Sequence, residues 1–101
     1  MKVYISGQIS GVKGYQKNFA VASQEIIKRG HIPVNPANVV HEGWSYKQYI
    51  DHDLILLSIC DAIYMLKGWE ESRGARLELN YAMTTGMQVI FEEDIKRGWL
   101  L

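Results

Sequence analysis

The stretch KVYISGQISGVKG, residues 2–14, decides the fold class, because a β-rich run passes there into a loop punctuated by glycines. Lys2 to Ser6 predicts a strand, and residues 7–14 predict a loop. A helix is expected from Tyr15 to Arg29, where apolar residues recur at helical spacing, and Gly30 follows as its terminating residue. The chain therefore opens as a strand, a loop and a helix.

The same alternation continues along the chain. Further strands are expected at residues 31–34, 61–66 and 87–91, and further helices at residues 46–60 and 73–85. Strands joined by helices in this way form a βαβ series, which favours a mainly parallel sheet with right-handed crossovers. We therefore expect an α/β fold of three layers, flavodoxin-like or Rossmann-like, with a mainly parallel sheet of four or five strands.

At 101 residues, the chain is expected to form one domain, residues 1–101, with little surface for enclosing a substrate alone. The tail EEDIKRGWLL has no clear pattern. Its apolar residues Trp99, Leu100 and Leu101 either cover an open face of the sheet or enter a subunit contact.

The composition excludes several classes of partner. Eleven basic and eleven acidic side chains give a formal net charge of zero without a run of Lys or Arg, which argues against binding a nucleic-acid polymer. No segment is long enough to span a bilayer, and the opening MKVYISG is too short for a signal peptide. The single cysteine, Cys60, lies in an apolar run and fits a reducing setting. We therefore expect a cytoplasmic protein without a membrane partner.

Ligands of such sheets bind at the carboxyl ends of the strands, where loops lead into helices. The first loop offers four candidate substrate-binding residues, Ser6, Gly7, Gln8 and Ser10. Its GQISG segment has the spacing of neither a dinucleotide fingerprint nor a P-loop, so NAD binding and ATP hydrolysis are not indicated and no cofactor is expected. The histidines show no metal-ligand spacing, and no metal is expected either.

Glu78 stands out in the predicted helix that begins near Ser72, because its neighbours in the sequence are largely apolar. Its carboxylate is therefore expected at or beside the core. Gly74, one turn earlier on the same face, leaves space for a small molecule to reach it. Alternatively, Glu78 pairs with Arg73, Arg76 or a backbone amide at a partly exposed helix face, and periodicity alone does not decide between the two.

Three further residues have both a functional and a structural interpretation. Asp53 falls on the apolar stripe of its helix, where it is either a site residue or a boundary acid bonded to backbone or tyrosine. Asp61 opens the third strand, which favours a structural role. Tyr4, in the first strand, fits a core residue with a satisfied hydroxyl.

The loops before the helices supply the remaining candidates. Ser72 either caps the helix or helps the helix amino terminus to hold a phosphate. Trp44 and Trp69 lie in loops at the predicted strand ends, where each either stacks on a planar base or serves as a hydrophobic lid or interface residue.

Three segments, VYISGQISG, DLILLSICDAIYML and SRGARLELNYA, together resemble the nucleoside 2-deoxyribosyltransferase superfamily, which includes the 2'-deoxynucleoside 5'-monophosphate N-glycosidases. The likeness covers nearly the whole chain and is greatest to short bacterial and phage members. The third segment is the most specific. Family members place a serine or aspartate, a glycine two positions on and a glutamate four positions later, which Ser72, Gly74 and Glu78 match.

This resemblance implies a role for each matching residue. Glu78 is implied to be the nucleophile that attacks the anomeric carbon of deoxyribose, and Tyr4 to orient it. Asp53, eight positions before Asp61, matches the acid that helps to protonate the departing base, while Asp61 is a weaker catalytic candidate. Ser72 matches the residue that contacts the 5' end of the sugar, where serine favours a phosphate. The GQISG loop lacks the arginine that the nucleotide hydrolases carry there.

The chemistry agrees with this assignment, because breaking an N-glycosidic bond develops positive charge on the sugar, which a carboxylate can stabilise and capture. Our first hypothesis is an N-glycosidase or deoxyribosyltransferase acting on a small nucleoside or nucleotide. The second is a non-catalytic nucleotide-binding module with the same fold. A homodimer or larger homo-oligomer is expected, because related enzymes complete their pockets with a neighbouring subunit and this chain ends in the apolar GWLL.

Overall fold

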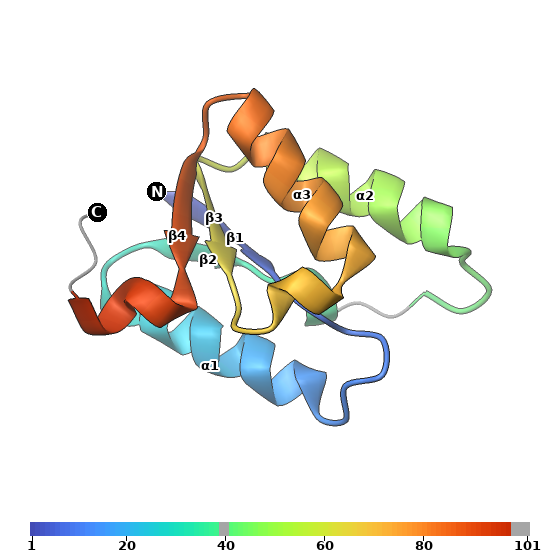
Figure 1. Cartoon of the computed structure of the whole chain (residues 1–101), viewed down its shortest axis with the longest axis horizontal. Helices are drawn as coiled ribbons and strands as arrows, with labels where there is room; N and C mark the ends of the chain where they lie inside the picture. Colours follow the sequence, from blue (N-terminus) through green and yellow to red (C-terminus); the bar gives the residue numbers. More distant parts are fainter. Residues whose placement is uncertain (39–40, 98–101) are drawn as a thin grey trace.

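The computed structural model describes residues 1–38 and 41–97 (Figure 1). Trp99, Leu100 and Leu101, for which the sequence leaves two placements open, lie outside the described residues. Within the described part, the sheet has four parallel strands in the order β2-β1-β3-β4, namely β1 (Lys2–Ser6), β2 (Ile32–Val34), β3 (Ala62–Met65) and β4 (Gln88–Phe91). The expected α/β fold with a four-stranded parallel sheet is confirmed, and these residues contain no fifth strand.

Helices cover both faces of this sheet. Helix α1 (Tyr15–Lys28) lies on one face, and helices α2 (Tyr46–Ser58) and α3 (Arg73–Thr84) lie together on the other (Figure 1). Short 3-10 helices follow three of the strands, η1 (Pro36–Asn38), η2 (Trp69–Glu71) and η3 (Glu92–Arg97). The result is the expected three-layer, flavodoxin-like or Rossmann-like arrangement. No helix of the described residues has the length and apolar character needed to cross a membrane.

The central strands are buried on both sides, as a sheet covered by two helical layers requires. Successive residues of β1 alternate between two cores. Val3 and Ile5 pack with the apolar face of α1, whereas Tyr4 packs with residues of β3, α2 and α3. Tyr4 therefore reaches the α2 and α3 side of the sheet, where the candidate site lies.

The helix boundaries follow local hydrogen bonding and differ from the predicted ones by one or two residues. At the start of α2, Ser45 and Gln48 form a capping box. The helix was expected to reach Cys60 but ends at Ser58, because Cys60 N–H turns back to the Leu57 carbonyl at 3.0 Å. The loops predicted at residues 35–44 and 67–72 contain the short helices η1 and η2.

The connections from the two central strands create an opening. The chain leaves β1 toward α1 on one face, whereas it leaves β3 toward α3 on the opposite face (Figure 1). The two strands are neighbours, and Ser6 of β1 pairs with Met65 of β3 at their carboxyl ends. Ligands of doubly wound sheets bind in the crevice at such a switch point.

Candidate functional site

A cavity of about 310 Å³ lies at the carboxyl end of β1, between the loop that follows this strand, η1, α2 and the start of α3. Its polar side chains come from seven residues, Ser10, Tyr15, Tyr46, Tyr49, Asp53, Ser72 and Glu78. It therefore combines two carboxyl groups with hydroxyl groups, which suits a small polar ligand.

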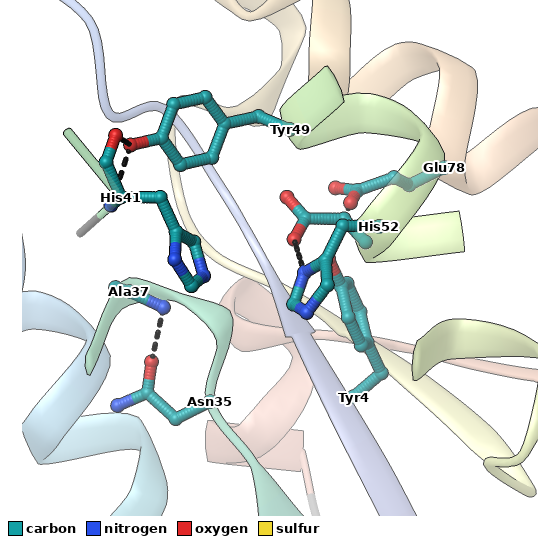
Figure 2. A network of polar contacts seen from close by, with 8 residues as sticks. Tyr4, Asn35, Ala37, His41, Tyr49, His52 and Glu78 are labelled. Atoms are coloured by element: carbon teal, nitrogen blue, oxygen red, sulfur yellow. Dashed lines mark hydrogen bonds and ion pairs between the residues drawn. The ribbon is translucent and has the colours of Figure 1, made fainter. Parts of the chain in front are cut away.

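Glu78 lies at the inner wall of this cavity, and its side chain is held by β1. The residue is 5% exposed, and its carboxylate accepts a hydrogen bond from the Tyr4 hydroxyl, which approaches it from β1 (Figure 2). A second hydrogen bond comes from Ser6 Oγ at 2.7 Å. The alternative that Glu78 pairs with an arginine at an exposed helix face is wrong. Arg76 donates instead to the Glu70 carbonyl at 2.6 Å, and the Arg73 guanidinium lies over the Tyr46 ring.

Burial changes the acidity of this carboxyl group. It raises the pKa of Glu78 to about 7, although the hydrogen bonds from Tyr4 and Ser6 lower it, and the nearby Asp53 carboxylate adds to the increase. The pKa of Tyr4 is raised well above its ordinary value, first by burial and then by the charge of Glu78. Tyr4 thus remains a hydrogen-bond donor to Glu78 across the ordinary pH range.

Asp53 supplies the second carboxyl group of the cavity. Burial raises its pKa, while the hydrogen bond and charge of His52 and the charge of His41 lower it. Its partner is His52, whose Nδ1 lies 3.4 Å from Asp53 Oδ1, and not the backbone or tyrosine group considered as an alternative. Two carboxyl groups with raised pKa values in one cavity can divide the roles of proton donor and nucleophile.

Two of the four residues predicted here, Gly7 and Ser10, belong to the loop after β1 and line the cavity. Ser6 is the last residue of β1 and holds Glu78, but it does not line the cavity itself. A Cβ atom on Gly7 would lie 2.9 Å from Leu66 Cβ, so the close approach of the loop to β3 requires a glycine. Gln8 lies elsewhere, because it lines a separate hollow of about 400 Å³ and donates to the Ser10 carbonyl at 3.4 Å. Its assignment to the substrate site is therefore wrong for this cavity.

Ser72 and Gly74 both line the cavity at the start of α3. Ser72 caps the helix, since its Oγ accepts a hydrogen bond from Ala75 N–H at 3.1 Å, and its hydroxyl proton remains able to reach a ligand. The space expected beside Gly74 is narrow. A Cβ atom there would lie 3.1 Å from Ile50 Cδ1 and 3.8 Å from the Ser72 and Tyr46 oxygens.

Two further predicted residues, Asp61 and Trp44, do not line the cavity. Asp61 precedes β3 and therefore lies at the amino end of the strand, where its Oδ2 accepts the Lys2 N–H at 2.8 Å. Asp61 therefore lies away from the cavity, which agrees with the structural role favoured by its place in the sequence and not with the weaker catalytic one. Trp44 does not line the cavity but stacks on His41, with ring centroids 3.8 Å apart. Trp69 packs on Phe91 with a centroid separation of 5.9 Å.

The sequence did not lead us to predict that helix α2 forms one wall of the cavity. Tyr46, Tyr49 and Ile50 line it together with Asp53. These positions follow the i, i+3, i+4, i+7 spacing of one helical face, so the placement of Asp53 already contained the signal. No group of His, Cys, Asp and Glu suited to a metal ion occurs in the part of the chain that the structure describes.

Comparison with known proteins gives a family but no activity. No curated protein matches the chain. Residues 1–91 match the model of one protein family, and this match includes β1 to β4 and every residue of the cavity. The chain therefore belongs to the family described as a domain of unknown function, DUF4406.

Proposed function

We propose that this protein cleaves or transfers the N-glycosidic bond of a 2'-deoxynucleoside or its 5'-monophosphate, with Glu78 as the nucleophile. One observation carries the proposal: Glu78 is buried, lines the cavity and is oriented by hydrogen bonds from Tyr4 and Ser6. A buried carboxylate is costly unless it has a function or a full set of partners. The resemblance of the chain to the nucleoside 2-deoxyribosyltransferase superfamily supports the same reaction.

The reaction proceeds in two steps. A Glu78 oxygen attacks the anomeric carbon of deoxyribose while the bond to the base nitrogen breaks, which forms a glycosyl ester on Glu78. Asp53 gives its proton to the departing base. Water then attacks the same carbon and releases the sugar in a hydrolase, whereas the nitrogen of a second base attacks in a transferase. Either step restores the Glu78 carboxylate, and neither needs a cofactor.

The start of α3 is suited to the 5' end of the sugar. Ser72 and Gly74 line the cavity there, and the first N–H groups of a helix lack intrahelical acceptors. A phosphate would receive hydrogen bonds from such groups and from the Ser72 hydroxyl. We therefore place the monophosphate ahead of the free nucleoside as substrate.

The proposed function also predicts which partners the protein binds. The ligand is a small nucleoside or nucleotide, without a nucleic-acid polymer or a membrane, and a second copy of the chain completes the site. Exposed apolar side chains support self-association, namely Ile55 on α2, Ile59 directly after α2 and Met83 on α3. The single, buried cysteine supports a cytoplasmic setting.

The test is incubation with a panel of deoxynucleosides and their monophosphates, with the released base measured by chromatography. The proposal expects base release that is lost in Glu78→Gln, which keeps the size of the side chain, and is retained in Glu71→Gln, a change in exposed η2. Binding of panel members without any turnover contradicts the proposal and identifies a non-catalytic nucleotide-binding module.

A further inference from the structure

A histidine outside the cavity contacts one of the two carboxyl groups inside it. His52 follows Tyr49 and Ile50 on α2 but does not line the cavity, whereas Asp53 does. The His52 Nδ1 atom lies 3.4 Å from Asp53 Oδ1. The His52 side chain is 38% exposed and that of Asp53 only 17%. His52 therefore stands between a largely buried acid and the solvent.

Aromatic packing fixes the orientation of this imidazole. The His52 ring meets the rings of His41 and Trp44 edge-on, with centroids 5.6 Å and 5.4 Å away. His41 and Trp44 stack with only 14° between their planes. The Tyr49 hydroxyl holds His41 in place by accepting its N–H at 2.8 Å and donating to its carbonyl at 2.7 Å (Figure 2). These contacts restrict the rotamers of His52 before any ligand binds.

We propose that His52 is a positioning residue for Asp53, because its imidazole fixes the Asp53 carboxyl group at the cavity wall and connects this group to solvent. The inference rests on the proposed function, in which Asp53 protonates the departing base. That step leaves Asp53 as a carboxylate. Protonated His52 then passes its Nδ1 proton to Asp53 Oδ1, and the neutral imidazole takes up, through solvent, the proton that the attacking water or second base loses in the second step. Histidine suits this exchange because it gains and loses protons near neutral pH.

Four titratable groups interact electrostatically with Asp53. His52 lies beside it on α2, His41 faces it from the preceding loop, Glu78 from α3 and Tyr4 from β1. Burial raises the pKa of Asp53, and the two histidines are the groups that lower it. Without His52, only the charge of His41 counteracts the increase in the Asp53 pKa that burial causes. The pKa of Asp53 must then increase further.

The first experiment needs no activity. The Asp53 carboxyl group is titrated by carbon-13 NMR in the natural protein, in His52→Gln and in His31→Gln. The control residue His31 lies at the other end of the sheet, 3.1 Å from the terminal amine of Met1. We expect the pKa of Asp53 to rise by roughly half a unit in His52→Gln, the scale of a partly exposed ion pair, and to stay unchanged in the control.

The second experiment measures base release. In His52→Gln, kcat should fall by up to about 10²-fold, the lower end of what a general acid contributes. His52→Ala leaves space for free imidazole, which should restore part of kcat. If the natural protein releases base but neither the Asp53 pKa nor kcat differs between His52→Gln and His31→Gln, the positioning role is overturned and the proposed function stands. If no base is released but the Asp53 pKa rises in His52→Gln, the positioning contact stands and the proposed function fails.

Discussion

The Tyr4 hydroxyl donates a hydrogen bond to the Glu78 carboxylate across 74 positions of sequence. The Tyr4 ring is completely buried in the core between the sheet and helices α2 and α3, so its hydroxyl has little freedom to move. Ser6, two residues further along the same strand, binds the other Glu78 oxygen at 2.7 Å. The orientation of the carboxylate is therefore set by β1, a central strand that is buried from Val3 to Ser6.

Replacement of Tyr4 by phenylalanine should raise the pKa of Glu78 above its value of about 7, because the ring remains but a hydrogen bond that stabilises the carboxylate is lost. A hydrogen bond to a charged group contributes about 1.5 to 3 kcal/mol, which corresponds to a rise of roughly one to two pKa units. Carbon-13 NMR titration of the Glu78 carboxyl measures this. Tyr81→Phe serves as the control on α3, and an unchanged Glu78 titration in Tyr4→Phe would show that the contact does not control the carboxylate.

Glu78 should also make the folded protein less stable at neutral pH than at acidic pH. Its pKa in the folded state, about 7, lies above the ordinary 4.5, so the folded state binds more protons and stability is lost as the pH rises through this range. At 1.36 kcal/mol for each pKa unit, the loss is about 3 kcal/mol. Urea unfolding at pH 5 and pH 8 should show this loss in the natural protein and in Glu71→Gln, but a smaller loss in Glu78→Gln. If all three proteins lost the same folding free energy between pH 5 and pH 8, Glu78 would not be the cause of the pH dependence.

A phosphate held by Ser72 and the start of α3 predicts that a deoxynucleoside monophosphate binds more tightly than the matching nucleoside. The expected difference is about 1.5 to 3 kcal/mol, as for hydrogen bonds to a charged group. Calorimetric titration with both ligands measures it. Ser72→Ala should reduce the difference and also cost about 1 kcal/mol of folding stability through the lost cap. Equal affinity for the two ligands would leave Ser72 with its capping role alone.

Self-association should place two copies of the chain together at micromolar concentration. Ile55 on α2 and Ile59, the residue directly after this helix, are both exposed, and the sequence ends in GWLL. Sedimentation is compared for the intact chain, a double variant Ile55→Glu and Ile59→Glu, and a chain that ends after Arg97. We expect a dimer of the intact chain and dissociation in at least one of the other two. If the intact chain were monomeric, the proposed self-association would be contradicted.

Much of the fold could be predicted because its determinants are local. Periodicity and glycine placement located β1, α1 and α3 to within one or two residues, and the alternation of strands and helices predicted the parallel sheet. Glu78 could be identified because a charged residue is unexpected among the apolar residues of a helix. The GWLL ending has no repeat pattern, so the sequence offered no physical basis for placing it.

The partners of the site residues could not be predicted, because they depend on how distant segments meet. Ser6 and Glu78 are 72 positions apart, and nothing in either segment indicates which side chain the carboxylate will contact. Asp61 stayed a catalytic candidate only through the family resemblance, whereas its place at the start of the third strand already favoured the structural role that agrees with its contact to Lys2 N–H. Gln8 was misplaced because a loop can direct neighbouring side chains to different sides of the sheet.

The most direct test of Glu78 as the nucleophile is mass spectrometry of the protein quenched during turnover of a deoxynucleoside monophosphate. We expect a transient mass increase of one deoxyribosyl phosphate group on the peptide that contains Glu78. The corresponding peptide of the Glu78→Gln variant should show no such increase. A sugar adduct on a different residue, or base release by Glu78→Gln at the rate of the natural protein, would contradict it.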